Sequence, residues 1–465
     1  MKKTLLLTSA AFLLTMETPA LAAETMTMEQ MQKQIEMLAQ KVEKLGGVVE
    51  AQGGIIEAQK AQIETQSQKI VQQEAAVSQK LANIAPAAGG TDGVKISMKP
   101  SPKIESADGK YSFQPIGRVH LDYTHFADDK RDQPNGAHFR RARIGFKGNL
   151  GEDFNYKAEM DFSGEGSNIK EMYLAYTGFD LAELWAGNFK PPVGLEQNTS
   201  SNYMSFTELS PASTAFTRDE ILGAALKGGG ENWSLAGGVF NEDPGNNTTD
   251  DEAVSLDARG SVDLLMNSPN VLHVGLGGSF RSPNSTTESV TLTGRPAGTG
   301  PNMITTGAIT NVDRSTVWSA ELAGVFGPLS FQGEYFLNNI DRANGSSPDF
   351  DGWYGQASYF LTGETRPYKG KTGNFDRVKP ENPLSRSEGG WGAWEVLARY
   401  DNLDLTDRSA GIVGGEMSNV TLGVNWYMTD YIRTMLNVVD VNTNDDASVP
   451  DDDPTVATVR VQWDF

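Results

Sequence analysis

Apolar residues return at every seventh position between Met28 and Ile84, without a break. These positions are Met28, Ile35, Val42, Val49, Ile56, Ile63, Ile70, Val77 and Ile84. An unbroken repeat of this period is typical of a left-handed coiled coil and not of a helix lying on a globule. We therefore expect an α-helical coiled-coil stalk over 24–84, in which the repeat from Met28 to Ile84 extends about 85 Å at the rise of an α-helix. A single solvated helix or a disordered spacer is the alternative.

From Tyr111 onward the pattern changes to a two-residue alternation. In 118–123, Val, Leu and Tyr occupy one face of a predicted strand, and Arg, His and Asp occupy the other. The same alternation recurs later, at 141–147, 156–162, 432–438 and 459–465. A soluble sandwich also alternates, but it buries its apolar face against a second sheet. Here the opposite face is charged in strand after strand, as expected for a membrane barrel with a water-filled lumen.

The connections between the strands also indicate a membrane barrel. Short links such as 149–153 and 428–430 alternate with long polar ones. The long ones are 126–138, 241–253, 283–314 and 442–453. Outer-membrane barrels place short turns in the periplasm and long loops outside. We predict an all-β transmembrane barrel of about 16 antiparallel strands over 111–465. The segment 362–390 is periplasmic by parity yet long, so it either folds into the lumen or holds two more strands.

Two stretches flank the predicted stalk. Residues 1–23 have the features of a secretory signal peptide, with Lys2 and Lys3, a short apolar run and small residues before a cleavage site. The apolar run is too short to span a bilayer, and a retained N-terminal anchor is the alternative. Residues 85–110 carry Pro, Gly and Ser without a period, which predicts a linker.

Composition excludes several functions. The net charge of −21 argues against nucleic acid as a partner, because phosphates would be repelled. The chain has no cysteine, hence no disulfide or thiolate site, and none of its four histidines has a metal-ligand or hydrolase spacing. We therefore expect no enzyme activity, no cofactor and no metal. The acidic runs 250–252 and 451–453 fit solvated loop tips, or a weaker alternative in which they gather calcium or magnesium with lipopolysaccharide.

Several segments resemble the phosphate-selective porin O/P family of outer-membrane porins. They include Phe-Arg-Arg-Ala-Arg at 139–143, Tyr-Lys-Ala-Glu-Met-Asp-Phe at 156–162, Gly-Asn-Phe-Lys-Pro-Pro-Val-Gly-Leu-Glu at 187–196, Gly-Ala-Trp-Glu-Val-Leu-Ala-Arg-Tyr at 392–400 and Leu-Gly-Val-Asn-Trp-Tyr at 422–427. The resemblance covers roughly 111–465. It implies a homotrimer, location in the bacterial outer membrane with lipid and lipopolysaccharide as neighbours, and permeability that favours anions. The terminal Phe465 resembles the signal by which such barrels are delivered for assembly.

Charged side chains on the predicted inner face are the candidate selectivity residues, because pores select ions with fixed charges and hydrogen-bond donors. The candidate anion contacts are Arg118, Arg140, Arg141, Arg143, Lys147, Lys157, Lys190, Arg399, Arg433 and Arg460. Guanidinium groups suit phosphate because their fork donates to two oxygens at once. Thr199, Ser200 and Ser201, at what resembles the family's third external loop, are candidate hydroxyl donors at a constriction, with a solvated turn as the alternative.

Three features argue against strong phosphate selectivity. The same faces carry acidic residues, namely Asp122, Glu159, Asp161 and Glu395. The loop 191–217, which should narrow the pore, contains no Lys or Arg and carries Glu196 and Glu208. The chain as a whole is strongly acidic. Each arginine is therefore at least as well explained as an ion-paired lumen residue.

The sequence predicts an outer-membrane porin for passive diffusion of small hydrophilic solutes and ions, with a preference for anions or phosphate left open. A structural protein that tethers the membrane to peptidoglycan through the periplasmic coiled coil is the alternative. The long heptad repeat motivates that second function.

Overall fold

The chain divides into two units, Met1–Gly89 and Gly90–Phe465. The computed structural model describes residues 60, 69, 93–98, 100–127, 130, 133–164, 166–241, 253–267, 270–283, 288–296, 300–444 and 452–465. The predicted signal peptide and the predicted coiled coil, apart from Lys60 and Lys69, lie outside the described residues. No helix among the described residues is long and apolar enough to cross a membrane.

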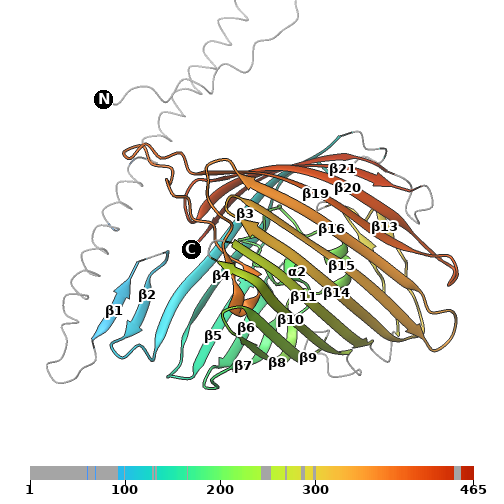
Figure 1. Cartoon of the computed structure of the whole chain (residues 1–465), viewed down its shortest axis with the longest axis horizontal. Coiled ribbons are helices and arrows are strands. Elements are labelled where there is room, and N and C mark those ends of the chain that lie inside the picture. Colours follow the sequence, from blue (N-terminus) through green and yellow to red (C-terminus); the bar gives the residue numbers. More distant parts are fainter. Residues whose placement is uncertain are drawn as a thin grey trace, which may run out of the picture. The chain divides into compact units, whose positions relative to one another are not determined.

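Sixteen strands within the described part of the chain form one closed antiparallel barrel (Figure 1). They are β3 (Ser112–Ala127), β4 (Gly136–Asn149), β5 (Phe154–Asp161), β6 (Asn168–Tyr176), β7 (Ala182–Phe189), β8 (Ile221–Gly229), β9 (Trp233–Asn241), β10 (Val254–Asn267), β11 (Asn270–Ser282), β14 (Val312–Phe326), β15 (Leu329–Arg342), β16 (Asp349–Phe360), β19 (Ala393–Asp407), β20 (Ile412–Tyr427), β21 (Ile432–Thr443) and β22 (Thr455–Asp464). Each pairs with the next, and β22 pairs with β3 to close the ring. The predicted number of strands and their antiparallel order are confirmed.

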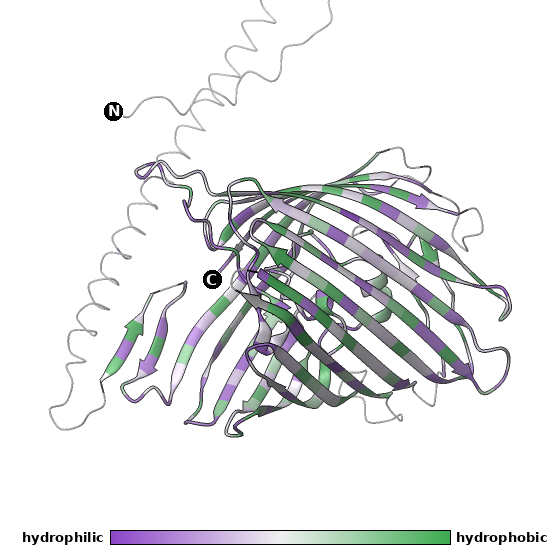
Figure 2. Cartoon of the chain, viewed as in Figure 1, coloured by the Kyte–Doolittle hydropathy of each residue, from purple (hydrophilic) through white to green (hydrophobic). Residues whose placement is uncertain are grey.

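Alternation along each strand separates the two faces of the barrel. In β22, Val459 and Trp463 are 40% and 39% exposed on the outside, while Arg460 between them is fully buried. Figure 2 shows hydrophobic and hydrophilic positions alternating along the long strands. Successive side chains of a strand point to opposite faces of the sheet. The register in which a strand pairs with its neighbours therefore decides which of its residues form the apolar outer face.

The barrel wall is uneven in height. The strands β5 to β9, which we call the short wall, have 8 or 9 residues each. The other eleven barrel strands have 10 to 16 residues. At the usual rise and a tilt near 45°, the short wall spans about 20 Å, less than the apolar band of about 25 Å typical of outer-membrane barrels.

A hydrophobic cluster, the inner core, lies inside the barrel where the long strands carry the long loops. Residues 288–296 and 300–311 enter there with the paired strands β12 (Thr293–Gly294) and β13 (Ile304–Thr305), together with α3 (Pro211–Phe216). The inner core consists of Phe126, Ala212, Phe216, Leu292, Met303, Ile304, Ile309, Val312, Val317, Phe336, Ile340, Phe350, Leu403, Leu405, Met417, Val439, Val441 and Val456. The expected charged inner face therefore gives way to apolar residues toward this end of the strands.

The segment 362–390 folds against the inner wall, one of the two arrangements that the sequence left open. It contains β17 (Tyr368–Lys369), η1 (Gly370–Thr372) and β18 (Asn374–Phe375). Arg259 of β10 donates to the carbonyl oxygen of Gly373 at 2.7 Å, and His273 of β11 lies 2.6 Å from the hydroxyl of Tyr368. The two short strands pair only with each other and do not join the barrel.

Part of the predicted linker 85–110 forms a hairpin. Strand β1 (Val94–Ser97) pairs with β2 (Lys103–Ser106), and β2 pairs with the first residues of β3. Val94 and Ile96 alternate with Lys95 and Ser97, a short strand pattern that Pro and Gly nearby obscure.

Closure of the barrel places Phe465 against Gly117. Their backbones exchange two hydrogen bonds of 3.0 Å. A Cβ on Gly117 would lie 2.4 Å from the ring of Phe465, so only glycine leaves room for the ring there.

Candidate functional site

The segment 190–220, between β7 and β8, folds inside the barrel and carries α2 (Leu195–Asn198) and α3. Ser210 caps α3 by accepting a hydrogen bond from the Ser213 amide at 3.1 Å, and Pro211 stands at its first turn. Glu334 of β15 accepts from the amides of Leu195 and Glu196, each at 2.7 Å. Small polar residues thus satisfy a backbone that is buried without a sheet partner.

Three of the predicted lumen arginines lie behind this segment and hold its backbone. Arg399 donates to the carbonyl oxygen of Glu208 at 3.1 Å, and Arg433 donates to that of Met204 at 2.7 Å. Arg460 donates to the carbonyl oxygen of Thr207. Guanidinium groups can serve carbonyl oxygens in this way because they carry five fixed donors. These three contacts fix the position of the segment in the lumen.

A cavity of about 980 Å³, which we call the passage, lies between this segment and strands β3 to β6. Its cationic lining residues are Arg118, Arg140, Arg141, Arg143, Lys147, Lys157, Lys170, Lys190, Arg218, Arg295, Lys369, Arg377 and Lys379. Its acidic ones are Glu159, Asp161, Glu171, Glu208, Asp219, Glu220, Asp376 and Asp464. Thirteen cationic side chains thus face eight acidic ones in a chain whose net charge is −21. The lining of the passage is therefore positively charged, opposite in sign to the net charge of the whole chain.

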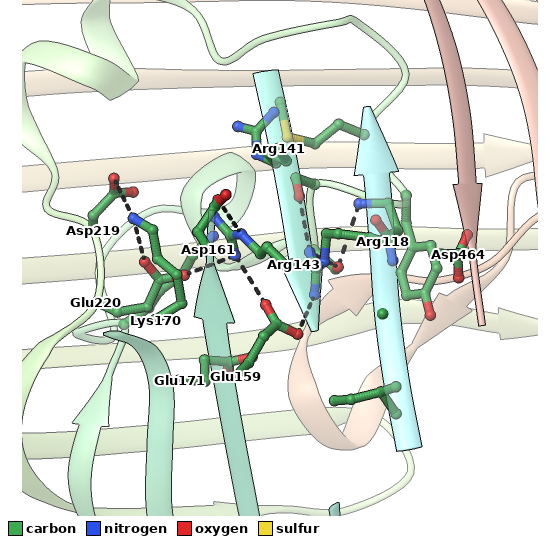
Figure 3. Close-up of a pocket in the computed structure, with 18 of the residues that line it drawn as sticks. Arg118, Arg141, Arg143, Glu159, Asp161, Lys170, Glu171, Asp219, Glu220 and Asp464 are labelled. Atoms are coloured by element: carbon green, nitrogen blue, oxygen red, sulfur yellow. Dashed lines mark hydrogen bonds and ion pairs between the residues drawn. The ribbon is translucent and has the colours of Figure 1, made fainter. Parts of the chain in front are cut away.

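Several of these charges form ion pairs between barrel strands. Arg118 of β3 and Arg143 of β4 each lie 3.1 Å from Glu159 of β5, and Arg143 also lies 2.8 Å from Asp161. Lys157 contacts Glu171 of β6. Figure 3 shows Arg118, Arg143 and Glu159 pointing toward one another from the three strands. The pairs hold the cations in place and reduce the charge available to a passing anion.

Glu208 sits among three guanidinium groups. Its Oε1 lies 2.8 Å from Arg141 and 2.6 Å from Arg460, and its Oε2 lies 3.0 Å from Arg140. Burial alone would raise the pKa of Glu208, yet the guanidinium groups of Arg140, Arg141 and Arg460 hold that pKa well below its usual range. Glu208 is therefore a buried, ionised carboxylate.

A β-bulge brings two adjacent arginines to the same face. In the pairing of β3 with β4, His120 lies opposite Arg141 but Leu121 lies opposite Phe139, so Arg140 is the extra residue. A bulge of this kind locally breaks the alternation of side chains. Arg140, which regular alternation would turn outward beside Arg141, reaches the passage for this reason.

Lys190 lies where β7 ends and the inner segment begins. Its Nζ donates to the carbonyl oxygen of Gln197 at 2.7 Å. Burial lowers the pKa of Lys190, while Glu220, Asp219 and Glu171 oppose that shift. Lys147 of β4 also lines the passage, and no ion pair to it is seen among the described residues.

The sequence-predicted residues fall into two groups. Seven of the ten candidate anion contacts line the passage, and these are Arg118, Arg140, Arg141, Arg143, Lys147, Lys157 and Lys190. Ser200 and Ser201 line it as well, and Ser201 accepts a hydrogen bond from Arg118 at 2.9 Å. The hydroxyl of Thr199 instead donates to the carbonyl oxygen of Leu195 at 2.9 Å. Contact of any of these residues with an anion stays a prediction.

Sequence reasoning missed the cations that connecting segments bring to the passage. These are Arg218, Arg295, Lys369, Arg377 and Lys379, while Lys170 comes from β6. Arg377 forms an ion pair with Asp464, which contributes to raising the pKa of the arginine although burial opposes it. The basic composition of 366–379 was a signal for lumen residues, but only the path of that segment reveals where they lie.

Residues 113–465 match the family described as phosphate-selective porin O and P. Porin O of Pseudomonas aeruginosa is 31% identical over 422 residues, covering 81% of this chain and 94% of that protein. An uncharacterized protein of Caulobacter vibrioides is 30% identical over 372 residues, covering 77% of this chain and 73% of the relative.

Two solved structures with the same fold share far less sequence. A loop L8 deletion mutant of OmpT, an outer membrane protein of Vibrio cholerae, matches with a TM-score of 0.50 and 10% identity, over 77% of this chain and 100% of that one. The high pH structure of Pseudomonas putida OprB matches with a TM-score of 0.50 and 10% identity, over 77% and 95%. At this identity the likeness concerns the fold.

Proposed function

This chain belongs to the phosphate-selective porin O and P family, and we propose that its passage conducts small hydrophilic solutes and ions with a preference for anions. The protein is an outer-membrane porin, and the porins of its family are channels. The observation that carries the anion preference is the excess of thirteen cationic over eight acidic side chains around the passage. Fixed charge at a narrow section attracts ions of the opposite sign.

The residues proposed to contact anions are the seven predicted cations of the passage together with Ser200 and Ser201. The ion pairs with Glu159 partly neutralise the positive charges of Arg118 and Arg143. This pairing supports a porin with a moderate anion preference over one that binds phosphate strongly.

Planar-bilayer recording of the purified protein tests this function. A potassium chloride gradient should give ohmic conductance and a reversal potential of the sign that a chloride-preferring channel produces. Absence of conductance would contradict the channel, and a potassium-preferring sign would contradict the anion preference alone.

We further propose a homotrimer whose contacts lie on the short wall. The strands β5 to β9 are too short to span the apolar band alone, so another protein surface is expected to cover them. Apolar residues on that wall, such as Leu184, Leu222 and Leu226, are exposed in the single chain. The long strands would instead face lipid and lipopolysaccharide. Chemical cross-linking in native membranes should give a trimer, and a monomer alone would contradict this assembly.

For residues 24–84 we propose a periplasmic coiled coil, following a cleaved signal peptide at 1–23 and connected by 85–110. The unbroken heptad repeat from Met28 to Ile84 supports it. A second function, tethering the outer membrane to peptidoglycan, rests on the same repeat. Deletion of 24–90 should weaken co-sedimentation of the porin with peptidoglycan, while unchanged sedimentation and assembly would eliminate that role.

A further inference from the structure

We propose that Glu208 is a built-in ligand that occupies the anion site of the passage and thereby limits how tightly the porin binds phosphate and similar oxyanions. This inference rests on the proposed anion preference and deepens it. It names the residue that sets the affinity of the site.

The geometry around Glu208 is that of an oxyanion site already filled. Each carboxylate oxygen receives two guanidinium donors, Oε1 from Arg141 and Arg460, and Oε2 from Arg140 and Arg141. A phosphate presents two oxygens on one side with similar spacing, so it would use the same donors. Glu208 and a phosphate therefore compete for one set of nitrogens.

The surroundings show which arginines would become free without Glu208. Arg460 also holds both oxygens of Asp122, at 2.7 Å each, and would stay paired. Neither Arg140 nor Arg141 has a second carboxylate at ion-pair distance among the described residues. The Nε of each likewise has no hydrogen-bond partner there. Loss of the Glu208 charge would therefore leave two unpaired guanidinium groups facing the passage.

The backbone around Glu208 is held by hydrogen bonds to two side chains of the barrel. Arg399 holds its carbonyl oxygen at 3.1 Å, and the amide of the preceding Thr207 donates to Asn437 at 2.8 Å. The carboxylate is thus held in place, because the backbone that carries it is bonded to side chains of β19 and β21. An arriving anion has to displace the carboxylate from its donors and cannot rely on the loop moving aside.

The test uses the full-length purified porin in planar bilayers, with inorganic phosphate added to potassium chloride at pH 7. In Glu208→Gln, which keeps the size of the side chain but removes its charge, phosphate should halve the chloride current at a concentration at least tenfold lower than in the unsubstituted protein. Adding Arg140→Gln to Glu208→Gln should remove most of that gain. Asp341→Asn, which removes an exposed carboxylate that does not line the passage, should leave the phosphate response unchanged.

The outcomes separate the two proposals. If Glu208→Gln is no more sensitive to phosphate while the reversal potential still shows anion preference, the role of Glu208 is wrong and the proposed function stands. If the unsubstituted protein conducts but shows no anion preference, the proposed anion preference is wrong, and the role of Glu208 that rests on it is wrong as well. Should Glu208→Gln fail to fold, Glu208→Asp decides, because its shorter side chain cannot serve Arg140 and Arg460 together. It should give an intermediate gain, and an unchanged response would overturn the inference.

Discussion

The inner core and the passage occupy the same barrel but are built differently. In β19 the inward residues change from Arg399 and Asp401 to Leu403 and Leu405 within a few positions. On one side, segments that fold into the lumen meet apolar strand residues and form a packed core like that of a soluble protein. On the other, cross-strand ion pairs line open space. The inward face of a barrel strand is therefore polar only where water reaches it.

The largest effect is expected from a substitution that opens a cavity in the inner core, and it is an effect on stability. Phe336 is fully buried in the inner core and its ring centroid lies 6.2 Å from that of Phe216 in α3. Phe336→Ala should lower the free energy of unfolding by about 3–5 kcal/mol, as for large-to-small changes in cores. Urea unfolding in lipid vesicles measures this. Tyr335→Ala, on the outer face of the same strand, should cost much less, and equal losses would contradict a packed core inside the lumen.

A charge reversal in the passage should change selectivity and not stability. Lys147→Glu alters the passage by two charges where no carboxylate neutralises the lysine among the described residues. The reversal potential in a chloride gradient should shift clearly toward cations. Arg314→Glu makes the same change at an exposed position of β14 that pairs with Asp341 at 2.8 Å. A shift of equal size in Arg314→Glu would mean that overall charge, and not the passage, sets selectivity.

Acid should loosen the inner segment through Glu220, which lies just before β8. Burial alone would raise the pKa of Glu220, but Lys190, Arg143 and Lys170 lower this pKa from 4.5 to about 2. A carboxyl group whose pKa is lowered by folding stabilises the folded state at any pH above its pKa in the unfolded chain. That stabilisation is lost as the pH falls toward 2. The urea midpoint of unfolding should therefore fall as the pH is lowered from about 5 to about 2. It should fall less in Glu220→Gln. Equal drops in both proteins would exclude Glu220 as a source.

The smallest effect is expected at Ser201. Ser201→Ala removes one hydrogen bond of 2.9 Å to Arg118, which keeps Glu159 as a partner. Stability should fall by about 1 kcal/mol or less, and conductance should stay within about a factor of two. Single-channel recording beside urea unfolding checks both. A large loss of conductance would make this hydroxyl part of the constriction.

Strand number and closure were predictable because alternation is a local property, readable in 118–123 or 459–465 without knowing the fold. The inner core was not, since Leu403 and Leu405 look like any strand residues and their partner segment 288–311 has no period. The site was predictable in part. Arg141 follows from alternation, but the meeting of Arg140 with Glu208 depends on a bulge and on the path of a long segment. Nothing in the local sequence encodes either.

The passage lies against β3 to β6, and the inner core lies toward the end of the strands that carries the long loops. Two of these strands, β5 and β6, belong to the short wall, which faces the neighbouring subunits in the proposed assembly. The passages of the three subunits would then lie on the sides that face one another. Their electric fields would overlap wherever two passages approach within a screening length of about 8–10 Å. Solutes would meet one common positive entrance instead of three independent ones.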